Sequence, residues 1–80
     1  MAKIQNNDHI DCFLTDDTLT IIRVFFDSEE EMTRLLTSTI MFLKVEDIFV
    51  GINPPIYFPT FDVIIKKENL EKAKTFIEAL

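Results

Sequence analysis

The run from Leu19 to Phe26 limits the fold of this 80-residue chain more than any other stretch. Its β-branched and aromatic residues are typical of a strand, and a strand points successive side chains to opposite faces. One face would carry Thr20, Ile22, Val24 and Phe26, and the other Leu19, Ile21, Arg23 and Phe25. Both faces are mainly apolar, which indicates a central strand that needs cover on both sides. A single helical layer would cover only one of them.

The residues before this run predict a hairpin that leads into it. Met1–Asp8 is polar and lacks a period, so we expect a loose, flexible N-terminus followed by one domain over residues 9–80. His9–Leu14 alternates apolar and polar residues as a short strand does. Thr15–Thr18 has the composition of a turn, because Asp and Thr side chains bond to nearby amides.

The residues after the run predict a helix, two strands and a closing helix. Ser28 and Glu31 have the spacing of a capping box, and apolar residues then recur at helical spacing for about four turns. Alternating residues predict strands over Val45–Ile52 and Phe61–Lys66. Asn69 is a candidate N-cap for the last helix. The order ββαββα predicts an α+β two-layer sandwich of the ferredoxin-like packing type. Its four-stranded, mainly antiparallel sheet would have both helices on one face, and the strand order stays open.

Composition and charge narrow the classes of function. The net charge is −6, and residues 1–47 hold ten acidic residues against four basic ones. This acidity disfavours direct nucleic-acid binding, which depends on Lys and Arg contacts with phosphates. It allows a basic protein partner, but ordinary solubility is the favoured explanation. A single cysteine and the lack of a long apolar run predict a cytoplasmic protein without a membrane contact.

Residues with catalytic or metal-binding chemistry do not form a pattern. His9 and Cys12 would diverge on a strand, and one His with one Cys cannot supply the four ligands of a zinc site. Gly51 stands alone, so there is no glycine-rich phosphate loop. We therefore predict no catalytic residues, no metal, no cofactor and no enzymatic activity.

The second face of the sheet is the first candidate binding surface. The residues expected on it are Phe13, Ile21, Arg23, Phe25, Phe49 and Ile64. Such an apolar surface is larger than monomers usually expose, which favours a homodimer or another protein partner. Arg23 would need an acidic partner, with Asp11, Asp47 and Asp62 as the candidates. A shifted register, a bulge, or cover by residues 1–8 or 53–60 would each remove this surface.

Two further regions are candidates for partner contact. A proline-stiffened loop presents Ile56, Tyr57 and Phe58, and aromatic residues on stiff loops lose little entropy on binding. These side chains could instead cap the open end of the core. An acidic flank comprises Asp16, Asp17, Glu29 and Glu30.

These observations favour a small, non-enzymatic protein-binding module that regulates or inhibits a partner by occupying its surface. A specific version is an acidic antagonist of the phage type, directed at a nucleic-acid-handling protein. The alternative is a small-molecule-sensing domain that holds a metabolite at a dimer interface. The sequence does not identify the partner or the ligand.

Overall fold

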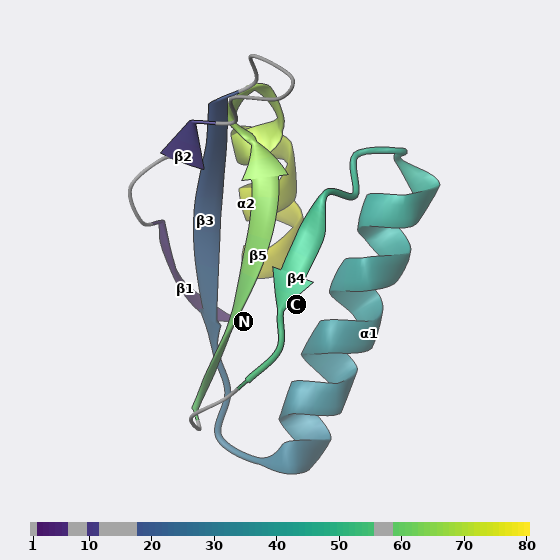
Figure 1. Ribbon diagram of the computed structural model, residues 1–80. Helices are drawn as coiled ribbons and strands as arrows, with labels where there is room; N and C mark the ends of the chain where they lie inside the picture. The colour runs from purple at the N-terminus through teal and green to yellow at the C-terminus, as the bar shows by residue number, and fades with distance from the viewer. Residues whose placement is uncertain (1, 7–9, 12–17, 56–58) are drawn as a thin grey trace.

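The predicted α+β two-layer sandwich is confirmed by the structure, a computed structural model that describes residues 2–6, 10–11, 18–55 and 59–80 (Figure 1). Its strands are β1 (Lys3–Asn6), β2 (Ile10–Asp11), β3 (Thr18–Phe25), β4 (Gly51–Asn53) and β5 (Thr60–Lys66). Its helices are α1 (Glu29–Val45), the 3-10 helix η1 (Lys67–Asn69) and α2 (Leu70–Glu78).

The sheet has the order β1-β3-β5-β4, and every neighbouring pair is antiparallel. β2 pairs with β3 beyond the end of β1, so these two short strands share one edge and the sheet has four strand positions. Helix α1 connects β3 to β4 and passes over β5, as in the split β-α-β unit of ferredoxin-like proteins. In those proteins the strand that follows the second helix pairs beside the first strand. Here β1 holds that edge.

The N-terminal segment differs from its prediction, because Lys3–Asn6 is an edge strand where a loose terminus was expected. Asn6 pairs with Ile22, whereas Ile10 pairs with Leu19. The register of pairing with β3 therefore shifts by one residue between β1 and β2. Backbone pairing does not require apolar side chains, so polar residues can form this strand.

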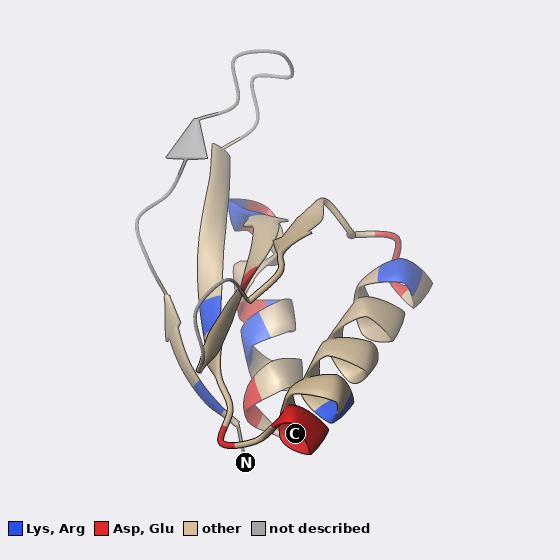
Figure 2. Ribbon diagram, turned by 60° about the horizontal axis from the view of Figure 1, so that its bottom comes forward, with Lys and Arg blue, Asp and Glu red and all other residues tan. Residues whose placement is uncertain are grey.

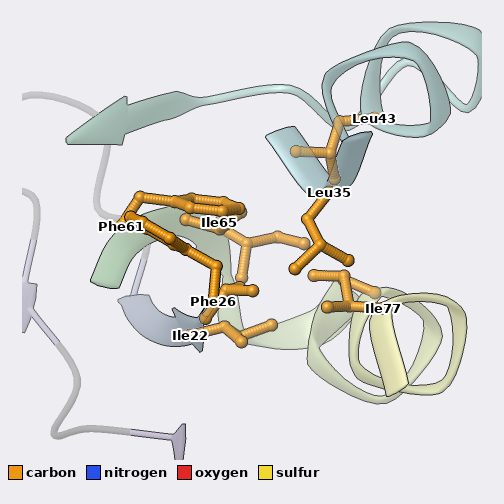
Figure 3. Packing of buried hydrophobic residues seen from close by; sticks show 10 residues of the cluster. Ile22, Phe26, Leu35, Leu43, Phe61, Ile65 and Ile77 are labelled. Carbon is orange, nitrogen blue, oxygen red and sulfur yellow. The ribbon is translucent and has the colours of Figure 1, made fainter. Parts of the chain in front are cut away.

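The core lies between one face of the sheet and the two helices (Figure 3). Along β3 and β5 every second side chain is buried, as the alternation of Leu19–Phe26 predicted. In Figure 3 the strand residues Ile22, Phe61 and Ile65 point toward Leu35 of α1 and Ile77 of α2. The helices therefore cover one face of the sheet and leave the opposite face to solvent or to a partner.

Helix α1 begins where its sequence predicted, because the backbone N–H of Glu31 donates to Oγ of Ser28 at 3.2 Å. Its end was predicted wrongly: Val45 closes the helix, and the strand expected over Val45–Ile52 is only Gly51–Asn53. The N–H of Asp47 donates to the carbonyl of Lys44, and that of Ile48 to the carbonyl of Leu43. Asp47 has φ of 57°, so this is a Schellman motif with an aspartate in the left-handed position.

Helix α2 follows β5 through η1 and runs antiparallel to α1. Lys72 Nζ lies 2.9 Å from Glu46 Oε1, and Arg34 Nη1 donates to the carbonyl oxygen of Leu80 at 3.1 Å. Each end of one helix is thus tied to the opposite end of the other. Asn69 lies at the N-cap position but makes no capping bond with its side chain, because its backbone belongs to the preceding 3-10 turn.

Candidate functional site

The face of the sheet that the helices leave uncovered is called the outer face below. Register and alternation place these described residues on it: Lys3, Gln5, Leu19, Ile21, Arg23, Phe25, Gly51, Asn53, Thr60, Asp62, Ile64 and Lys66. Of the residues predicted there, the structure brings together Ile21, Arg23, Phe25 and Ile64. Ile21 pairs directly with Ile64, and both are partly exposed. This face is therefore apolar at its centre.

An ion pair lies next to that apolar centre. Arg23 Nε donates to Asp62 Oδ1 at 3.0 Å, and Arg23 Nη2 approaches Oδ2 at 3.4 Å. Asp62 is thus the acidic partner among the three candidates. Its hydrogen bond and its charge raise the pKa of the Arg23 guanidinium above its usual value. The pair cancels its own charge within the sheet, which lowers the cost of covering this face.

Two further contacts shape the outer face. Lys3 Nζ lies 5.6 Å from the centre of the Phe25 ring, within the range of a cation–π contact. Ile64 Cδ1 leans toward Gly51 and lies 3.8 Å from where a Cβ on that glycine would be. The aromatic and aliphatic side chains are therefore partly covered by their neighbours.

Strand pairing does not place Phe49 on this face, where it was predicted, because Phe49 lies in the segment between α1 and β4 and outside the strands. Its side chain is 41% exposed, and Lys44 Nζ lies 5.7 Å from its ring centre.

The remaining predicted residues fall into two groups. Glu29 and Glu30 are exposed in the first turn of α1, where acidic residues gather at one end of the molecule (Figure 2). The others lie outside the described residues, namely Phe13, Asp16, Asp17, Ile56, Tyr57 and Phe58. The aromatic loop and half of the acidic flank therefore remain predictions.

A second apolar surface lies on the helical side and was missed by the sequence reasoning. It is a shallow, open groove of about 330 Å³ between α1 and α2, lined by Ser38, Met41, Phe42, Val45 and Phe76. The rings of Phe42 and Phe76 stack with centroids 4.0 Å apart. Met41 and Val45 are 62% and 79% exposed, the highest values among the large apolar residues that the structure describes. The signal in the sequence was the helical spacing of residues 38, 41, 42 and 45.

Other sites are weaker. A depression of about 240 Å³ at the end of α1 is lined by Asp47, Ile48, Phe49, Val50, Lys66, Glu68 and Asn69. That volume is below the usual range of small-molecule pockets. Among the described residues, no three His, Cys, Asp or Glu side chains are grouped to hold a metal ion. In the same part of the chain, neither helix has the length and apolar character needed to cross a bilayer.

Comparison with known proteins gives no match to a family, to a curated protein or to a solved structure. The chain is therefore described by its own geometry as an α+β sandwich with two apolar surfaces. One is the outer face of the sheet, and the other is the groove between the helices.

Proposed function

We propose that this chain is a non-enzymatic protein-binding domain that regulates or inhibits a partner by occupying its surface. Its binding site would be the groove between α1 and α2, and the occupant an amphipathic helix of the partner with basic flanks. The observation that carries this proposal is the exposure of Met41 and Val45 beside the stacked rings of Phe42 and Phe76.

The shape of the groove favours a helix as the occupant. Residues 38, 41, 42 and 45 have i, i+3, i+4 and i+7 spacing, so they form one stripe along α1. The antiparallel α2 supplies the other wall through Phe76. A third helix can lay its own apolar stripe between two such helices, a common mode of peptide recognition.

The charge of the surrounding segment favours a basic occupant. Residues 27–47 contain six acidic residues and two basic ones. Three of the acidic residues are successive glutamates in the first turn of α1. Basic residues beside the apolar stripe of the partner would therefore be attracted, most strongly at low salt.

The burial available in the groove indicates a weak affinity. Full burial of a Met or Val side chain contributes about 1.5–3 kcal/mol, so covering the exposed parts of Met41 and Val45 contributes about 2–4 kcal/mol. Ordering the peptide offsets part of this gain. We expect a dissociation constant on the order of 1 mM for a model peptide, since this corresponds to about 4 kcal/mol.

The test uses a fluorescent peptide of about 18 residues, which is as long as α1 when helical. It has one leucine stripe and lysine flanks, and a second peptide has the same stripe with glutamate flanks. Fluorescence anisotropy should show that the lysine peptide binds more tightly and that added salt weakens its binding. Met41→Asp should weaken binding at least tenfold, and the control Thr33→Asp, which adds the same charge outside the groove, should not.

The added charge of Met41→Asp attracts the lysine peptide, so a weaker complex must reflect lost apolar contact. Equal binding by both peptides would contradict the proposed basic partner. Unchanged binding by Met41→Asp would contradict the groove as the site.

A further inference from the structure

We infer that the outer face of the sheet is an interface between two copies of this chain, related by a two-fold axis parallel to the strands and midway between β3 and β5. This interface does not use the groove between the helices, so it goes beyond the proposed function. The argument rests on how the side chains of the outer face are arranged in rows across the strands.

One of these rows is polar and runs across all four strand positions. Gln5 pairs with Arg23, Arg23 with Asp62, and Asp62 with Asn53. The row therefore reads amide, cation, anion, amide. When the same row of a second copy is laid over it in reverse order, each amide lies opposite an amide and each charge lies opposite its counter-charge.

A two-fold axis parallel to the strands performs this reversal. Rotation about it exchanges the two sides of the sheet and leaves the position along the strands unchanged, so β3 lies over the second copy's β5. Arg23 then faces Asp62 of the second copy, and Gln5 faces Asn53. Two sheets packed face to face keep their strands within about 30° of alignment, so the central rows stay matched.

The neighbouring rows are matched by the same rotation. Ile21 pairs with Ile64 in the next row, so each isoleucine faces the other type across the interface. On the other side of the polar row, Phe25 faces Thr60 of the second copy. The rotation therefore places the apolar centre against the apolar centre of the second copy, and the ion pair against the ion pair of the second copy.

A two-fold axis perpendicular to the strands does not give this match. It would lay β3 over β3 of the second copy. An axis at the level of Arg23 would place the arginines of the two copies together. An axis at the level of Ile22 would place Arg23 over Ile21 of the second copy. Like charges or an unpaired charge against an apolar group oppose binding. The order of residues in the three central rows therefore selects the parallel axis, whereas the end row places Leu19 opposite Lys66 of the second copy.

The area predicts a weak but specific dimer. The five strands contain 4, 2, 8, 3 and 7 residues, and at about 3.3 Å along the strand and about 4.8 Å across it for each residue the sheet face measures about 380 Å² in each copy. Stable specific interfaces bury upward of about 1,000 Å² in total, so this interface, at about 760 Å², belongs with weak contacts. We expect dimerisation at submillimolar concentration.

The test pairs two charge reversals, Arg23→Asp and Asp62→Arg. The first makes the ion-pair positions of the outer face acidic, and the second makes them basic, so each variant alone should be a monomer by light scattering. Mixed in equal amounts, they should form a heterodimer, because an acidic row then faces a basic row. Mixing cannot restore the ion pair between positions 23 and 62 within one chain. A heterodimer that forms on mixing therefore shows contact between chains. Glu71→Arg, an exposed change of equal charge on α2, should leave wild-type dimerisation intact.

Three outcomes would overturn the inference: a monomeric wild type at about 500 μM, a dimer that both reversals leave unchanged, or a dimer that Met41→Asp dissociates. The last result would place self-association in the groove instead. If either reversal fails to fold, amide NMR shifts of the wild type provide the readout. On dilution they should move at residues 21, 23, 62 and 64 and stay fixed along α1, and the reverse pattern would again refute the interface.

Discussion

Replacing Thr39 with valine should stabilise the protein, because the change removes a buried hydroxyl from the core. Thr39 lies on the core face of α1 with no exposed area, and its Oγ1 has no hydrogen-bond partner among the described residues. An unsatisfied buried hydroxyl costs about 1–3 kcal/mol. Valine has nearly the same shape and similar helix propensity, so Thr39→Val removes this cost without a cavity or strain.

We expect the free energy of unfolding to rise by about 1–2 kcal/mol, since part of the cost is relieved by local motion. For a domain of this size each kcal/mol raises Tm by about 4–8 °C, so the shift should be about 4–16 °C. Urea unfolding followed by circular dichroism gives the free energy, and calorimetry gives Tm.

Thr33→Val is the matched control in the same helix. Its hydroxyl donates to the carbonyl of Glu29 at 3.0 Å on the exposed side, so its loss should change stability by less than about 0.5 kcal/mol. An unchanged or lower stability of Thr39→Val would refute the reasoning, because it would mean that the hydroxyl has a partner in solution.

The two ends of α1 give the remaining predictions. Asp47→Gly should raise the free energy of unfolding by about 1 kcal/mol in urea titration, since glycine adopts the left-handed conformation of the Schellman motif without a steric cost; lower stability would show that the aspartate side chain has a stabilising role there. Ser28→Ala should lower it by about 1 kcal/mol because it removes the hydroxyl that caps Glu31 N–H, and an unchanged melting temperature would mean that water replaces this cap.

The central strand and the start of α1 were predictable because their determinants are local. Alternation along Leu19–Phe26 is enough to assign two faces, and Ser28 with Glu31 is enough to assign a helix start. The end of α1 was not predictable, since an aspartate holds the position where glycine would have signalled the stop. Val45 and Phe49 were therefore assigned to a strand that begins only at Gly51.

The candidate surfaces depended on contacts between distant residues. Arg23 required an acidic partner, but the choice of Asp62 follows from the pairing of β3 with β5. The groove was missed because Phe42 and Phe76 meet only when α1 and α2 pack together. Sequence periodicity shows which side chains share a face of one helix or strand. It does not show which other element packs against that face.

The position of β1 links this chain to the usual ferredoxin-like arrangement by circular permutation. β1 occupies the edge that the last strand would fill, and β1 lies near the end of α2 in Figures 1 and 2. Joining the two ends of the chain and opening it between β2 and β3 would give the order β-α-β-β-α-β with every strand pairing retained. The same set of strand pairings is therefore compatible with either order of the chain.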